Sequence, residues 1–256
     1  MELPAKCLYV YGIVDAAIPS GLLAGAARGA ELESTSAGRV AAVHSWIDPA
    51  ELQDIQPDVA EGSRLAELVR RHDEIVMALA LAGPVLPVRL GTLLPDHETL
   101  ARVLAHSEQA IAEALDRIRG CAEWDLRAHA AAAPQGEEEP EPAHAAASSA
   151  QRGTDYLLGK RDARQRATEQ RTTVTAAING LDATLTELAK DSVGAGLDGA
   201  SVARAYLVAE HSQQQFLAAA QEGITELERL GCVAELRGPL PAYAFADVRL
   251  EANGHV

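Results

Sequence analysis

Short apolar runs bounded by turn-forming residues recur along the chain and predict β-strands. The first, at residues 7–14, is almost continuously apolar and ends before Asp15 and Pro19, which is typical of a buried strand. The second, at residues 38–46, alternates side chains between two faces, as a strand with one buried face does. The same criteria predict strands at residues 85–94 (interrupted by Pro87), 121–129, 203–208 and 232–236, and a weaker one at residues 30–34.

Apolar residues spaced three and four apart predict amphipathic helices between these strands. Three helices are expected at residues 58–81, 95–119 and 213–230, and Gly83-Pro84 should end the first of them. The most regular pattern belongs to a fourth helix, whose inner face is formed by Val174, Ile178, Leu181, Leu185 and Leu188. The glycine-rich residues 194–199 that follow predict a turn.

Strands and helices therefore alternate in both halves of the chain, which indicates an α+β protein with two domains, each a small sheet packed with helices. We place the N-terminal α+β domain at residues 1–120 and the C-terminal one at residues 121–256. Residues 130–150 lose all hydrophobic periodicity and combine glutamates and prolines with no lysine or arginine. They predict a flexible acidic insert in the second domain.

The charge balance argues against nucleic acid and lipid membranes as partners. The 256 residues carry a formal net charge of −15, which repels phosphate backbones and anionic lipid surfaces. No signal peptide or membrane-spanning run is visible, so a cytoplasmic protein is expected. Cys7, Cys121 and Cys232 lie far apart in apolar runs, where small buried side chains are the expected role.

One window of the chain is basic. Residues 152–171 hold six basic and three acidic side chains, and Lys160, Arg161 and Arg164 are the candidate contacts for a partner. The alternative is a basic helix face that packs against the protein's own acidic surface. The sequence leaves both interpretations open.

Patterns of catalytic and ligand-binding residues are missing. The sequence has no phosphate-binding glycine loop, no Gly-x-Ser-x-Gly and no His-Glu-x-x-His motif, and the eight histidines form no pair at metal-ligand spacing. His72 lies on the apolar side of its helix, where a buried core histidine is expected. We therefore predict no catalytic, cofactor-binding or metal-binding residues and no enzymatic activity.

Several segments, in order, resemble the GvpF/GvpL family of gas vesicle proteins. They are Leu8-Tyr9-Val10-Tyr11-Gly12-Ile13-Val14, His72-Asp73-Glu74-Ile75-Val76, Val85-Leu86-Pro87-Val88-Arg89-Leu90-Gly91-Thr92, Glu123-Trp124-Asp125-Leu126-Arg127, Gly153-Thr154-Asp155-Tyr156-Leu157, Ala205-Tyr206-Leu207-Val208 and Gly238-Pro239-Leu240-Pro241-Ala242-Tyr243-Ala244-Phe245. Each segment alone is a weak signal, whereas the ordered set extends over nearly the whole chain.

This resemblance implies a two-domain α+β protein in which one domain is ferredoxin-like. It implies a gas vesicle assembly accessory protein or minor structural component, associated with the vesicles in the cytoplasm. The implied partners are the main gas vesicle shell protein and other vesicle accessory proteins, and the resemblance brings no active site, cofactor or oligomeric state. Two alternatives remain open at this point: a ferredoxin-like regulatory protein that senses a small ligand, and an enzyme of an unrecognised type.

Overall fold

The computed structural model describes residues 5–17, 21, 23, 31–49, 63–130, 149–195, 201–246 and 250. The chain forms two compact units: the first takes the described parts of Met1–Trp124 and Gly238–Val256, and the second takes those of Asp125–Arg237. Residues 238–256 were predicted to belong to the second domain, whereas their described part belongs to the first unit. The division into domains at residue 120 remains a prediction.

The first unit is built on a five-stranded antiparallel sheet in the order β2-β3-β1-β4, with β5 also paired to β1. Its strands are β1 (Cys7–Asp15), β2 (Glu33–Ala37), β3 (Val40–Ile47), β4 (Val85–Pro87) and β5 (Leu93–Leu94). The predicted strand at residues 85–94 is thus two short strands. Gly38, at a φ of 57°, turns the chain between β2 and β3, because a positive φ suits glycine.

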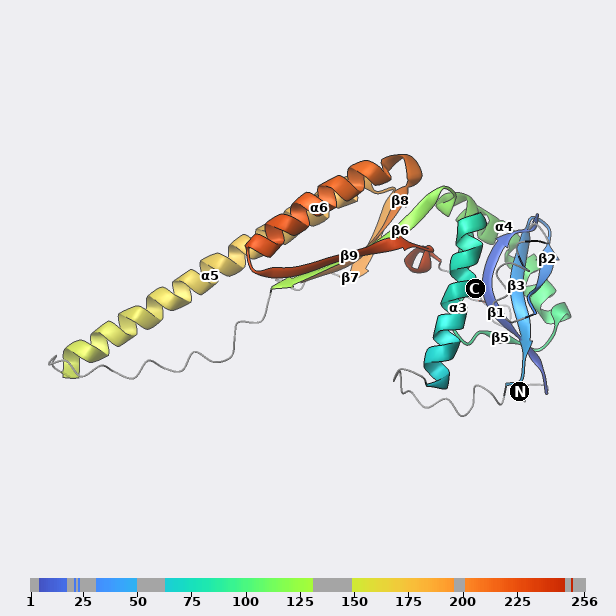
Figure 1. Ribbon diagram of the computed structural model, residues 1–256, viewed down its shortest axis with the longest axis horizontal. Coiled ribbons are helices and arrows are strands. Elements are labelled where there is room, and N and C mark those ends of the chain that lie inside the picture. The colour runs from blue at the N-terminus through green and yellow to red at the C-terminus, as the bar shows by residue number, and fades with distance from the viewer. Residues whose placement is uncertain are drawn as a thin grey trace. The chain divides into compact units, whose positions relative to one another are not determined.

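Two helices cover this sheet (Figure 1). The helix α3 (Arg64–Ala82) packs against one face, where its buried Ile75, Val76 and Leu79 join the core formed by β1, β3 and β4. The helix α4 (His97–Ile118) contacts β2, β3 and β1. Both helices begin at side-chain caps: Ser63 Oγ accepts from Ala66 N at 3.1 Å, and Asp96 Oδ1 accepts from Thr99 N at 2.7 Å.

The second unit contains β6 (Cys121–Ala130), α5 (Ser149–Leu188), β7 (Asp191–Ala195), β8 (Ser201–Ala209), α6 (Gln213–Arg229) and β9 (Cys232–Leu240). The first residues of β6, up to Trp124, and the last residues of β9, from Gly238, belong to the first unit. Short 3-10 turns lie at Glu210–Ser212 and Tyr243–Phe245. The four strands pair in the order β7-β8-β6-β9. This β-α-β-β-α-β succession, with its first and third strands adjacent in the sheet, is ferredoxin-like, as the resemblance implied.

The helices α5 and α6 lie side by side in this unit (Figure 1). Val174, Ile178, Leu181 and Leu185 are buried on α5, which confirms four positions of the predicted inner face; the fifth, Leu188, is partly buried. Gly223 of α6 lies close against α5, because a Cβ atom there would lie 2.3 Å from Leu181 Cδ1. The two helices therefore pack tightly over the C-terminal half of α5.

The strand β7 corrects the prediction of a turn that begins at Gly194. Gly194 pairs with Arg204 of β8, and a Cβ atom at Gly194 would lie 2.7 Å from the carbonyl oxygen of Ala203. The glycine is thus a residue of close backbone approach inside a strand, a role that glycine also has in sheets. Of the predicted turn, residues 196–199 lie outside the described residues, as do residues 131–148 of the predicted acidic insert.

Candidate functional site

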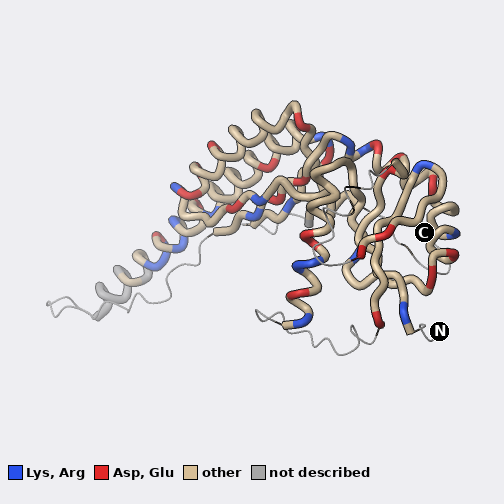
Figure 2. Tube along the Cα trace, turned by 45° about the vertical axis from the view of Figure 1, so that its right-hand side comes forward, with Lys and Arg blue, Asp and Glu red and all other residues tan. Residues whose placement is uncertain are grey.

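The basic window predicted from the sequence lies on α5. Lys160, Arg161 and Arg164 are exposed, and so is every described side chain from residue 158 to residue 173. Among the side chains of α5 whose burial is described, Val174 is the first buried one, so the exposed residues 158–173 form about four turns of helix before the part that packs on α6. Figure 2 shows the basic residues along this part of the helix.

These three cations have no carboxylate partner among the described residues. Lys160 contacts Tyr156, whose hydroxyl lies 3.5 Å from Nζ and whose ring centroid lies 5.5 Å away. Within the described part of the chain, no ion pair is formed by Arg161 or Arg164. The alternative of a basic face packed against the protein's own acidic surface therefore has no support in these contacts, and the cations face solvent.

The second exposed surface is an apolar strip on α3, in the first unit. It borders a surface hollow of about 610 Å³ and consists of Ala66, Val69, Met77, Ala78 and Leu81, with Arg70, Asp73 and Glu74 along it. Leu81 is 86% exposed, which is unusual for a leucine in a folded helix. An uncovered apolar strip with a charged border is typical of a surface that binds another protein.

His72 is a core histidine, as its position on the apolar side of its helix predicted. It is buried on α3, and its Nδ1 atom lies 3.0 Å from the hydroxyl of Tyr9, which also accepts from Gly91 N at 3.3 Å. Burial lowers the pKa of His72 and raises the pKa of Tyr9 to about 12, so both groups stay neutral in the physiological range. Their contacts stabilise the core of the first unit.

Two of the three cysteines are buried as predicted, and the third is not. Cys7 and Cys232 are buried, and burial raises the pKa of both thiols, so they remain protonated. Cys121 is partly exposed at the start of β6. All three are free thiols.

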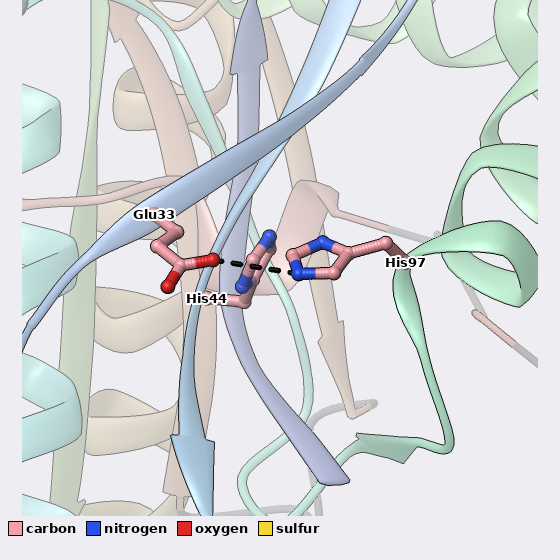
Figure 3. Close-up of side chains that lie close together, drawn as sticks. All are labelled: Glu33, His44 and His97. Carbon is pink, nitrogen blue, oxygen red and sulfur yellow. Dashed lines mark ion pairs between the residues drawn. The ribbon is translucent and has the colours of Figure 1, made fainter.

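A polar cluster that the sequence analysis did not connect lies where α4 begins over the β2–β3 hairpin. Glu33 and His44 are direct partners in the register of β2 and β3, and His97 is the first residue of α4. Each of the three offers a ligand atom within 4.8 Å of the others (Figure 3). His97 Nε2 lies 3.4 Å from Glu33 Oε2.

The hydroxyl of Thr35 bridges the two imidazoles of this cluster. Its Oγ1 atom lies 2.9 Å from His44 Nε2 and 2.9 Å from His97 Nδ1. His44 is fully buried, and burial, aided by the nearby imidazole of His97, lowers its pKa to about 4. A neutral His44 beside a carboxylate and a second imidazole is an arrangement able to hold a cation.

Comparisons with known proteins identify the family to which the chain belongs. The family model described as "Gas vesicle synthesis protein GvpL/GvpF" matches residues 7–247. The chain belongs to the GvpL/GvpF family of gas vesicle synthesis proteins. A curated relative, gas vesicle protein L of Streptomyces sp. (strain CB03234), is 32% identical over 198 residues, which cover 73% of this chain and 71% of the relative.

Two solved members have the same fold. The crystal structure of gas vesicle protein GvpF from Anabaena sp. PCC7120 matches with a TM-score of 0.65 at 14% identity, over 95% of this chain and 97% of that one. The GvpF structure from Microcystis aeruginosa matches with a TM-score of 0.62 at 15% identity, over 94% and 99% of the two chains. Because each match extends over almost the entire chain, the GvpL/GvpF fold includes both units.

Among the described helices, none combines the length and the apolar character that crossing a bilayer requires.

Proposed function

We propose that this GvpL/GvpF protein is a non-enzymatic assembly factor or minor component that binds the main gas vesicle shell protein and other vesicle proteins in the cytoplasm. The observation that supports a role in gas vesicle synthesis is the family match over residues 7–247. A strongly apolar shell protein needs its apolar surface covered until it polymerises, and a soluble, acidic partner would suppress its aggregation.

The apolar strip on α3 supports the binding part of this proposal. Val69 and Leu81 expose large apolar groups that a folded protein normally buries, and Ala66 and Ala78 leave room for a partner's side chains. An amphipathic or extended apolar segment of the shell protein would bury this strip on binding. Arg70, Asp73 and Glu74 beside it would fix the orientation of the partner through charge.

A pull-down with purified shell protein tests the proposed function, with vesicle yield measured in a strain that lacks this protein. Leu81→Glu is the variant of choice, because a residue so exposed changes folding stability by no more than about 0.5 kcal/mol. We expect this variant to fold, to retain less shell protein and to restore fewer vesicles. The matched control is Leu217→Glu on α6, another exposed leucine outside the strip.

The proposal would be wrong if the wild-type protein failed to retain the shell protein and the deletion strain formed vesicles normally. Equal retention by Leu81→Glu and the wild-type protein would instead move the contact away from α3. The two results are separable because the first concerns the whole protein and the second concerns one surface.

The basic window is proposed as a second contact, which steers the partner rather than holding it. Reversing Arg161 and Arg164 to glutamate is expected to slow association about 10-fold at low salt, since charge steering raises on-rates by at least that factor. The difference should shrink as salt approaches 0.1 M, where fields are screened over about 10 Å. Stopped-flow or surface-based association rates, measured across a salt series, provide the test.

The control for this experiment is the double reversal Arg102→Glu and Arg229→Glu, which changes the net charge equally on α4 and α6. Arg102 forms an exposed ion pair with Glu98, and Arg229 forms one with Glu226, each within its own helix. Such pairs contribute little to stability, so the control protein should fold. If both double variants slow association by the same factor, net charge alone is responsible and the basic window has no specific role.

A further inference from the structure

We infer that Glu33, His44 and His97 form a binding site for a divalent transition-metal cation of the Zn²⁺ type. Two imidazole nitrogens and one carboxylate oxygen are ligands that zinc takes in proteins, with a water molecule or another group in the fourth position. Hard cations such as Mg²⁺ and Ca²⁺ prefer all-oxygen sites, so the two histidines select against them. The site is separate from both surfaces proposed for protein binding.

The backbone brings two of the three ligands together before any tertiary packing. Because Gly38 and Arg39 turn the chain, Glu33 and His44 lie directly opposite each other on β2 and β3. Side chains of directly paired residues leave the same face of a sheet. The third ligand arrives with α4, which contacts this hairpin and starts with His97 immediately after its cap at Asp96.

The distances fit a small cation. Zinc bonds of about 2.0–2.1 Å in a tetrahedral arrangement separate ligand atoms by roughly 3.3–3.4 Å. His97 Nε2 and Glu33 Oε2 already lie 3.4 Å apart, and all three ligand atoms lie within 4.8 Å of one another. Glu33 and His97 are partly exposed, so small rotations of these two side chains would close the site around a cation that enters from solvent.

Thr35 prepares His97 for this role. A histidine that binds a metal through one nitrogen usually donates its other N–H to a neighbouring oxygen, which fixes the tautomer. Thr35 Oγ1 lies 2.9 Å from His97 Nδ1 and is placed to accept that hydrogen bond. The Nε2 lone pair of His97 then faces the carboxylate of Glu33, and a cation between them would turn a repulsive contact into an attractive one.

His44 is the buried anchor of the site. Its Nε2 atom contacts Thr35, whereas its Nδ1 atom is buried without a hydrogen-bond partner among the described residues. A buried polar atom left unpaired is costly, and such atoms often mark a site for an ion or another ligand.

Metal titration of the tag-free protein tests this inference. We expect about one equivalent of Zn²⁺ to bind by calorimetry and to raise the melting temperature. Co²⁺ alone, used as an optical probe, should give the visible absorption of a nitrogen- and oxygen-bound ion. Glu33→Gln and His97→Ala alter partly exposed side chains, so both should fold and should weaken Zn²⁺ binding by at least about 10-fold.

The matched control is His106→Ala, which removes an exposed histidine of the same helix outside the cluster. It should leave the affinity unchanged, and Thr35→Val should lower it by about 10-fold through loss of the bridging hydroxyl. The inference is overturned if the wild-type protein binds no Zn²⁺ or if Glu33→Gln and His97→Ala bind it as tightly as the wild-type protein. Neither outcome depends on the shell protein, so it leaves the proposed function untouched.

Discussion

Replacing Asp182 by alanine is expected to destabilise the second unit by about 3–5 kcal/mol, because it breaks a mostly buried charged contact from one side. Asp182 of α5 is 8% exposed and accepts a hydrogen bond from the hydroxyl of Tyr206 at 2.6 Å. Arg204 Nε lies 2.7 Å from the same carboxylate oxygen. The change leaves the buried Tyr206 hydroxyl without its acceptor and removes the opposite charge beside the largely buried Arg204 guanidinium, whose Nη1 still donates to Ser192 Oγ at 3.3 Å. The hydroxyl and the remaining charge keep the cost of leaving water.

Urea unfolding gives the measurement, followed by circular dichroism. Trp46 and Trp124, the only tryptophans of the chain, both belong to the first unit, so their fluorescence provides an internal comparison. The loss of stability in Asp182→Ala should shift the unfolding transition followed by circular dichroism to a lower urea concentration. Asp182→Asn, which keeps an acceptor oxygen, should lose less, and Asp162→Ala on the exposed part of α5 should stay within about 0.5 kcal/mol. A loss below about 1 kcal/mol for Asp182→Ala would show that water or a neighbouring group replaces the carboxylate.

Local patterns predicted most of the fold, because each helix and strand buries a face whose period the sequence shows. The buried residues of α5 recur at the expected spacing, and α4 begins at a capping aspartate one residue after Pro95. Patterns failed where a residue type serves two purposes. Gly194 indicated a turn, whereas it stands inside β7 because the backbone of β8 approaches it too closely for a side chain.

The candidate sites were harder to predict from local patterns than the helices and strands, because they depend on tertiary packing. The cations of the basic window could be placed on a helix from sequence, but their exposure depends on where α6 stops covering α5. Glu33 and His44 could have been paired by counting outward from Gly38, once the turn was placed there. Their approach to His97 could not have been predicted from the sequence, because it depends on how α4 packs over the sheet rather than on any local pattern.

The second large loss of folding stability is expected in the segment after β9. Phe245 is 3% exposed, and its own carbonyl oxygen accepts from Arg117 Nη2 at 2.9 Å. The preceding residue, Ala244, donates its backbone N–H to Glu123 Oε2 at 2.7 Å. The Phe245 side chain is buried, whereas Tyr243 remains 38% exposed and its hydroxyl donates to Asp73.

Phe245→Ala is therefore expected to destabilise the first unit by about 3–5 kcal/mol, the usual cost of deleting a buried phenylalanine ring. Phe245→Leu should lose less than about 1.5 kcal/mol, because it keeps most of the apolar volume. Tyr243→Phe removes one hydrogen bond at a partly exposed site and should lose about 0.5–1.5 kcal/mol. Urea unfolding followed by tryptophan fluorescence measures all three.

The spectroscopic signal that changes in these variants also tests to which unit the segment after β9 belongs. Phe245 follows β9 in sequence, yet its carbonyl oxygen accepts from Arg117, and the N–H of the neighbouring Ala244 donates to Glu123; both partners lie in the first unit. In Phe245→Ala, the unfolding transition followed by tryptophan fluorescence should therefore shift. The transition that Asp182→Ala shifts, which is followed by circular dichroism, should stay where it is. A loss confined to the second unit would show that residues after Gly238 fold with the domain that precedes them in sequence. A loss below about 1 kcal/mol would show that the ring contributes no more than a surface residue does.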